Sequence, residues 1–394
     1  MTINAIAVII LLGGWIFGRL FEKIRLPGVL GMVVFGILCS VGIKDLAPQT
    51  LWEISPFLKS LALIVILLRA GLGISRSNLQ KAGRVALLMT FVPCIFEGTA
   101  LTFVFHYLFG FSFAVAGLTA FMLAAVSPAV IVPTMLHLKQ NGYGRVNEVP
   151  TIILAGASVD DVFAITIFSA FLGIAANREV NLFASLASIP LSIAAGIILG
   201  AIIGYVLVTW LEKRYHSIRA TEKTLVLLTA AIFLAEVGDW VHIAALLGVM
   251  TVGYIMLQKS EKVAHEIASK LGKIWVFAEI ILFVLIGFSV DVSVAADAGL
   301  KGLLAISIGL FFRSIGVWLA TAFSSLSLKE RLFCVIAYLP KATVQAALGS
   351  VALNNGIAEG QIILAIAVLS IVFTAPLGLF GIRFFSPRLL KIDL

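Results

Sequence analysis

The sequence is dominated by long, uncharged apolar segments that follow one another with only short polar connections. A helix needs about 20 apolar residues to cross the roughly 30 Å hydrocarbon core of a bilayer. Only 12% of the residues are charged and 61% are hydrophobic, which leaves too little polar surface for a water-soluble fold. The sequence therefore predicts an all-α membrane protein with thirteen transmembrane helices, at 3–20, 28–43, 57–75, 85–108, 112–138, 150–175, 183–210, 223–238, 242–258, 274–290, 301–324, 331–354 and 360–382.

The lysines and arginines between these spans test the predicted count, because cytoplasmic loops carry an excess of them. When successive loops are assigned alternately to the two sides, only Lys44, Arg178 and Lys301 fall on one side and all the others on the opposite side. This asymmetry explains the net charge of +8 without a nucleic-acid partner. It predicts a multi-pass protein of the cell membrane, with its N-terminus outside and its C-terminus in the cytoplasm.

Two of the predicted spans are interrupted near their middle by proline beside polar residues, at 127–133 and at 340–345. These are the fifth and twelfth spans, so an odd number of crossings separates them and the two helices would run in opposite directions. Secondary transporters are often built from inverted repeats whose broken helices meet at the substrate site. Two independent proline kinks are the alternative, since membrane helices tolerate them. We therefore predict inverted six-helix repeats with two crossed broken helices.

The sharpest chemical signal is a pair of adjacent aspartates, Asp160 and Asp161, in the middle of the sixth span. A charge at that depth costs at least about 2.5–3.5 kcal/mol on insertion scales, so it needs a partner or a water-filled cavity. Neighbouring helical residues point about 100° apart, so one aspartate can line a cavity while the other meets a second partner. Small residues at 156–158 precede them and allow close approach of another helix.

A buried carboxylate of this kind can hold either a proton or a small cation. Carboxylate oxygens suit hard cations, and removal from water favours the protonated form of the group. This competition is the minimal chemistry needed to exchange a cation for a proton. The alternative is a purely structural ion pair, for example with Lys341.

Four further ionisable residues lie deep in predicted spans: Glu97, Arg313, Lys341 and Glu279. Glu97 and Arg313 occupy matching helices of the two repeats, and arginine keeps its proton, so we expect a fixed bidentate structural pair. Lys341 lies at the second break and could neutralise Asp160 or bind a helix end. Glu279 could be a secondary cation ligand, a pH modulator, or a residue that its neighbours shield from lipid.

Other functional classes lack their sequence features. Cys39, Cys94 and Cys334 have no metal-binding spacing, and their odd number argues against a disulfide framework. There is no phosphate-binding GxxxxGK[ST] loop, so neither ATP-driven pumping nor a nucleotide partner is expected. Adjacent aspartates on one helix do not form the facing pair of an aspartyl protease. We expect no enzyme activity and no cofactor, and a cation channel remains the alternative from a different class.

Four stretches carry a resemblance to a known family: VSPAVIVPTML (126–136), QNGYG (140–144), ASVDDVFAIT (157–166) and LPKATVQAALG (339–349). They resemble the NHA group of sodium/proton exchangers, within the cation/proton antiporter superfamily, and the resemblance covers nearly the whole chain. It implies a homodimer in which a mobile six-helix core moves like an elevator against a dimerisation domain.

The same resemblance assigns roles to individual residues. It implies that Asp161 is the ion-binding aspartate and Asp160 its neighbour. Glu97 and Arg313 match a membrane-buried salt bridge, and Lys341 matches the lysine on the second broken helix. The electrogenic bacterial relatives have a lysine where this chain has Arg313, so the resemblance favours electroneutral exchange.

From these features we expect an antiporter that exchanges Na⁺ or Li⁺ for protons, with the cation bound at Asp161. Ser158, Ser127 and Thr343 are candidates for further cation-coordinating oxygens. Exchange of K⁺ for protons is the alternative, because oxygen ligands alone do not fix the size of the cation.

The domain organisation follows from the same repeats. Residues 1–394 are expected to form one transmembrane unit. Its core would comprise approximately 57–175 and 274–382, and its dimerisation scaffold approximately 3–43 and 183–258.

Overall fold

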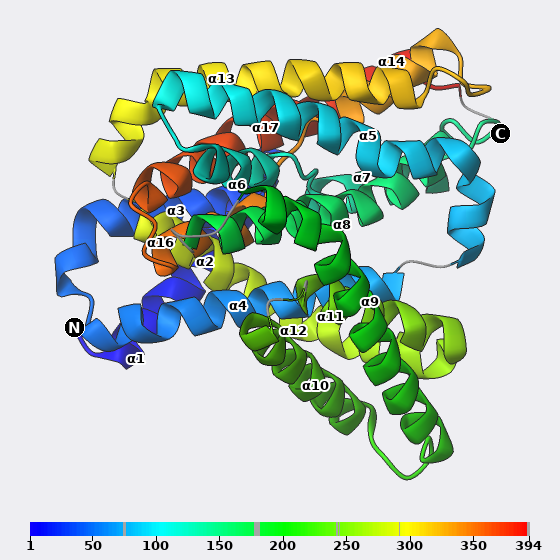
Figure 1. Ribbon diagram of the computed structural model, residues 1–394, viewed down its shortest axis with the longest axis horizontal. Helices are drawn as coiled ribbons and strands as arrows, with labels where there is room; N and C mark the ends of the chain where they lie inside the picture. The colour runs from blue at the N-terminus through cyan, green and yellow to red at the C-terminus, as the bar shows by residue number, and fades with distance from the viewer. Residues whose placement is uncertain (74–75, 177–181, 242, 244, 291, 392–394) are drawn as a thin grey trace.

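The computed structural model describes the chain except residues 74–75, 177–181, 242, 244, 291 and 392–394, and every element in the described part is a helix (Figure 1). The first ten elements are α1 Ile3–Val8, η1 Ile9–Gly13, α2 Gly14–Lys23, α3 Gly28–Ile43, η2 Lys44–Leu46, α4 Gln49–Gly73, α5 Arg76–Phe109, α6 Phe113–Leu123, α7 Pro128–Gln140 and α8 Val149–Ala176. The remainder are α9 Leu182–Lys213, α10 Ala220–Val241, α11 Ala245–Lys259, α12 Glu261–Ser289, α13 Val292–Ala320, α14 Leu328–Ala337, α15 Thr343–Leu348, α16 Val351–Asn354 and α17 Gly360–Leu389.

The all-helical membrane fold is confirmed, and each predicted span overlaps at least one helix of the described residues. Within the described residues, eight helical segments are long and apolar enough to cross a bilayer, and shorter apolar helices such as α6 and α11 lie between them. The total of thirteen crossings and the inverted repeat stay predictions, because length and composition alone do not establish them.

Both predicted breaks are present, but each begins earlier in the chain than the sequence suggested. The first unwound stretch is 124–127, between α6 and α7, and the second is 338–342, between α14 and α15. Pro128 is the first residue of α7, where its missing N–H costs nothing, and Pro133 lies inside α7 without ending it. A proline disfavours helix in the residue before it, so the unwound residues precede Pro128 and do not extend to Pro133.

The helices pack in two groups. In the first, α5 packs against α6, α8 and α13, and α13 packs against α17; α5 and α13 lie side by side along the top of Figure 1. In the second, α12 packs against α3 and α4, and α11 packs against α4 and α9. The largest apolar cluster spans both groups and includes the fully buried side chains of Leu68, Phe105, Leu118, Phe283 and Ile363.

The contact between α3 and α12 depends on glycine. A Cβ atom at Gly36 would lie 2.3 Å from the Val284 carbonyl oxygen, and one at Gly287 would lie 2.3 Å from the Val33 carbonyl oxygen. The two backbones therefore touch directly, as helices in membranes do where small residues face each other. This contact ties α12 to α3.

Candidate functional site

The two breaks are joined by a backbone hydrogen bond. The Ser127 N–H donates to the Pro340 carbonyl oxygen at 2.8 Å. Gln345, from α15, donates from its side-chain amide to carbonyl oxygens at the end of α6 and in the first break. The predicted meeting of the two interrupted helices is thus found at 124–127 and 338–342.

Arg313, on α13, lies beside this junction and is fully buried. Its Nη1 contacts Glu97 Oε2 at 2.8 Å, and its Nη2 contacts Asp160 Oδ2 at 2.8 Å. Nε donates to the Tyr338 carbonyl oxygen at 2.7 Å, and Nη1 also donates to the Ala124 carbonyl oxygen. The expected pair with Glu97 is present, but it is not bidentate, because the planar guanidinium divides its donors between two carboxylates and both breaks.

Lys341 lies in the second break and pairs with Glu97, not with Asp160. Its Nζ is 2.7 Å from Glu97 Oε1 and 2.9 Å from Oε2, and it reaches the Ala125 carbonyl oxygen at 3.5 Å. The backbone N–H of Lys341 donates to Thr374 Oγ1 on α17 at 2.9 Å. The result is a buried chain of alternating charge, Lys341–Glu97–Arg313–Asp160, in which two cations balance two anions.

Asp161 is the remaining carboxylate at this place. It is 7% exposed, it forms no ion pair within the described part of the chain, and its Oδ1 has no hydrogen-bond partner. Asp160 differs because its Oδ2 also accepts a hydrogen bond from the Val126 N–H at 2.9 Å. Because neighbouring residues of a helix point about 100° apart, Asp160 faces Arg313 and the first break, whereas Asp161 faces elsewhere and makes no ion pair in the described structure.

Several oxygen atoms near the junction have no hydrogen-bond partner in the described part of the chain. Ser127 Oγ and Thr343 Oγ1 are buried without a hydrogen bond, as are Asp160 Oδ1 and Gln345 Oε1. Buried polar atoms are normally satisfied by protein, water or a bound ligand, so unpartnered oxygens suit a cation and its water. Ser158, the remaining candidate ligand, has its side chain outside the described residues.

A glycine on α8 allows the second break to come close to the aspartates. A Cβ atom at Gly156 would lie 2.2 Å from the Tyr338 hydroxyl oxygen and 2.9 Å from Met89 Cβ. Tyr338 is in turn the residue whose carbonyl accepts from Arg313 Nε. The small residues predicted to permit close approach do so at Gly156.

Comparison with known proteins decides the family. A family model described as "Sodium/hydrogen exchanger, transmembrane" matches residues 7–385. Human sodium/hydrogen exchanger 9B2 is 32% identical over 410 residues, covering 98% of this chain and 75% of that protein. The chain belongs to the sodium/hydrogen exchanger family. It is a monovalent cation/proton antiporter, which confirms the resemblance seen in the sequence.

Two further comparisons agree. Human sodium/hydrogen exchanger 9B1 is 30% identical over 395 residues, covering 95% of this chain and 75% of that protein. The sodium proton antiporter MjNhaP1 from Methanocaldococcus jannaschii, in its structure at pH 8, superimposes with a TM-score of 0.81 at 19% identity, covering 98% of each chain. At that identity the superposition supports the fold alone.

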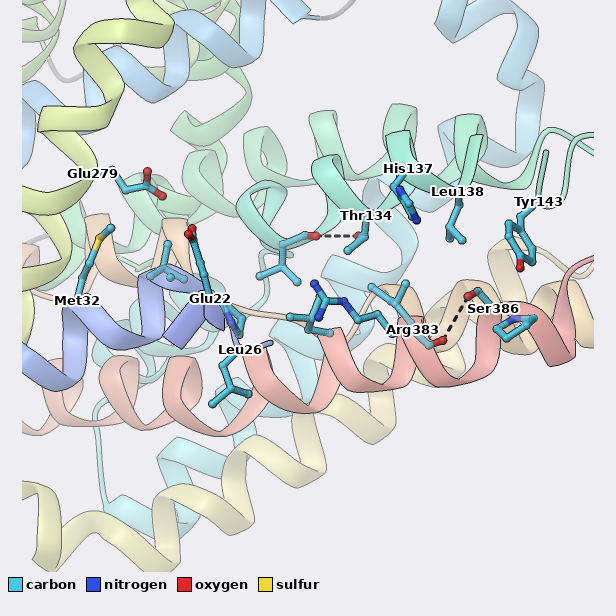
Figure 2. A pocket seen from close by; sticks show the side chains of 17 residues that line it. Glu22, Leu26, Met32, Thr134, His137, Leu138, Tyr143, Glu279, Arg383 and Ser386 are labelled. Atoms are coloured by element: carbon cyan, nitrogen blue, oxygen red, sulfur yellow. Dashed lines mark hydrogen bonds between the residues drawn. The ribbon is translucent and has the colours of Figure 1, made fainter. Parts of the chain in front are cut away.

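The exchanger also has a cavity of about 680 Å³ beside the α2–α3 turn, where Glu279 is found (Figure 2). Glu279 and Glu22 line it from α12 and α2, Thr134 and His137 from α7, and Arg383 from α17. The cavity lies between the two packing groups. Its wall includes Val130, about one helical turn after the first break, and none of the four charged residues of the network lines it, so the structure places Glu279 outside that network.

Some residues of the exchanger site were missed by sequence reasoning. Gln345 and Tyr338 were given no role, although both bind at the breaks. The sequence could have pointed to Gln345, because it is an amide in an apolar stretch beside a break. It could not have pointed to the backbone groups that bind Asp160 and Arg313, because every residue carries such groups. Lys59, on α4, is buried and donates to Ser289 Oγ at 2.9 Å.

Proposed function

We propose that the chain exchanges Na⁺ or Li⁺ for protons, and that Asp161 is the group that binds them alternately. One observation carries the proposal. The four other buried charges at the breaks form a balanced network, which leaves Asp161 as a buried carboxylate with no ion pair among the described residues. A carboxylate without a fixed counterion can take up either a proton or a cation, and family membership supports antiport over a channel.

Ser127 and Thr343 are proposed to supply further oxygens to the cation. Both hydroxyls are buried and have no hydrogen-bond partner among the residues that the structure describes, and both lie at the edge of a break. Ser158 stays a candidate on sequence grounds. Glu279 is proposed as a modulator, because it lies in the cavity together with Glu22.

For the mechanism we propose an elevator movement in a homodimer of the cell membrane, with the N-terminus outside. Sequence alone grouped α4 and most of α12 with the core. Their packing against α3 and α11 supports a scaffold of α1–α4 and α9–α12 instead, with α5–α8 and α13–α17 forming the moving core. The cavity lies between these two parts, and the Arg383 guanidinium donates to the Arg25 carbonyl oxygen across the same boundary at 3.1 Å.

The proposal is tested with purified protein in proteoliposomes that contain a pH-sensitive dye. Addition of Na⁺ or Li⁺ should restore fluorescence with wild-type protein and leave it unchanged with Asp161→Asn, because an amide can ligate a cation but cannot exchange a proton. Asp45→Asn, at an exposed carboxylate, is the matched control and should behave as wild type. A response to K⁺ and not to Na⁺ or Li⁺ would establish the alternative substrate, and full activity of Asp161→Asn would refute the role of Asp161.

A further inference from the structure

Gln345 is a fully buried, uncharged side chain at the point where the two broken helices meet. Its Nε2 donates to the carbonyl oxygens of Met122, Leu123 and Ala125 at 3.1, 3.3 and 3.0 Å. Met122 and Leu123 are the last two residues of α6, and Ala125 lies in the first break. One amide therefore binds both the end of a helix and the unwound stretch that follows it.

The orientation of this amide is fixed by chemistry. Carbonyl oxygens only accept hydrogen bonds, so the NH₂ group must face them and Oε1 must point away. Oε1 is itself buried without a hydrogen-bond partner among the described residues. The two N–H groups of Gln345 are thus shared among three backbone acceptors, while its own acceptor is left without a partner in that part of the chain.

The carbonyls of the first break need such donors. The last four carbonyls of a helix have no partner within it, and those of α6 end inside the protein. Arg313 binds the Ala124 carbonyl, and Lys341 shares the Ala125 carbonyl with Gln345. Among these three donors from the second half of the chain, Gln345 alone carries no charge. A cation in its place would add a third positive charge at the junction, where two cations already balance two carboxylates.

We propose that Gln345 is a positioning residue for cation exchange: it holds the first break in register with the second without adding charge. In that register the Val126 N–H stays bonded to Asp160 and the Ser127 N–H stays bonded to Pro340. The inference rests on the proposed role of Asp161. Gln345 acts through the backbone and does not itself exchange a proton.

The first test is Gln345→Met, which keeps the length and apolar stem of the side chain but removes both donors. The KM for Na⁺ should rise about tenfold, the effect of losing one buried hydrogen-bonded contact, while the maximal rate changes less. Gln361→Met is the matched control, because Gln361 lies in the first turn of α17 and its amide bonds to neither break in the described structure. Its KM should equal that of wild type.

A second readout separates positioning from general loss of stability. In Gln345→Met, hydrogen–deuterium exchange at residues 124–127 should accelerate about tenfold, while exchange in α9 and α11 stays as in wild type. A uniform acceleration across the protein, or unchanged exchange at the break, would overturn the proposal. If the methionine variant does not fold, Gln345→Asn takes its place, because it keeps the donors but is one methylene too short to reach all three carbonyls.

A charge test completes the experiment. Gln345→Lys retains donors for the carbonyls but adds a positive charge, so the break should stay protected from hydrogen exchange while Na⁺ transport falls at least about tenfold. Transport at the wild-type level would refute the requirement for a neutral donor. If wild-type protein itself shows no cation exchange, the proposed function fails. If wild type exchanges and the Gln345 variants match it in KM, only the positioning role fails.

Discussion

At the residue scale, Asp160 and Asp161 have different environments although they are adjacent. Asp160 Oδ2 accepts from Arg313 Nη2 and from the Val126 N–H, whereas Asp161 has no ion pair in the part of the chain described. A carboxylate that is bonded to a permanently charged guanidinium is poorly suited to releasing and taking up protons. This difference supports the proposal that Asp161 exchanges the proton for the cation and that Asp160 holds the site together.

This division predicts the behaviour of Asp160→Asn. The amide oxygen can still accept from the Val126 N–H, but the ion pair with Arg313 is lost, so thermal stability should fall and the KM for Na⁺ should change while exchange persists. Melting curves and proteoliposome exchange measure the two effects, with Asp45→Asn as the control. An inactive Asp160→Asn beside an active Asp161→Asn would show that the two roles are reversed.

The sequence identified the charged residues of the site, but it did not show which of them pair with each other. The aspartates, Glu97, Arg313 and Lys341 could be identified because a charge inside an apolar span is costly and needs a reason. The pairing of Lys341 with Glu97 could not, because it depends on how the two breaks meet in space. Gln345 was given no role for a related reason: an amide carries no charge, and its contacts are with carbonyl groups that every residue has.

At the element scale, the two breaks were predicted from their prolines, but their limits were not. Proline disfavours helix in the residue before it, so the first unwound stretch ends before Pro128. The second includes Pro340, and neither stretch extends to the predicted ends at 133 and 345.

The position of α8 against the second break adds a steric requirement at Gly156, where there is no room for a Cβ atom beside the Tyr338 hydroxyl.

Gly156→Ala should therefore destabilise the protein by about 1–3 kcal/mol, because the added methyl group must displace Tyr338 and with it a carbonyl bound by Arg313. Gly173→Ala on the same helix is the matched control. A Cβ atom there meets nothing within 4 Å, so this change should be neutral or slightly stabilising through helix propensity. Equal melting temperatures for the two variants would contradict the steric argument.

The charge network makes a second prediction at this scale. Glu97 contacts both Arg313 and Lys341, so Glu97→Gln would leave two buried cations short of one negative charge. Breaking a buried pair typically costs about 3–5 kcal/mol, and Arg313→Ala should act similarly. Thermal stability should fall much more than the apparent affinity for Na⁺ changes, with Glu53→Gln at an exposed carboxylate as the control. A large change in affinity at unchanged stability would instead place Glu97 in direct contact with the cation.

At the scale of the whole molecule, hydropathy predicted the helices because the bilayer imposes their length and apolar character. It did not predict the cavity or the packing of α4 and α12 against α3 and α11, because those features depend on which helix faces meet. Glycine contacts such as Gly36 with Gly287 determine those faces, and no periodic pattern in the sequence reveals their partners.

The balanced network also predicts the net charge moved by the whole protein. Arginine keeps its proton in proteins, and Lys341 is paired with both oxygens of Glu97, so we expect neither residue to contribute a proton to the cycle. If Asp161 exchanges one proton for one monovalent cation, the same charge crosses in each direction and transport is electroneutral. Proteoliposomes with equal pH and equal Na⁺ on both sides test this when a membrane potential is imposed. Wild-type protein should then accumulate no Na⁺, and sustained accumulation that Asp161→Asn abolishes would show that a second proton moves with each cycle.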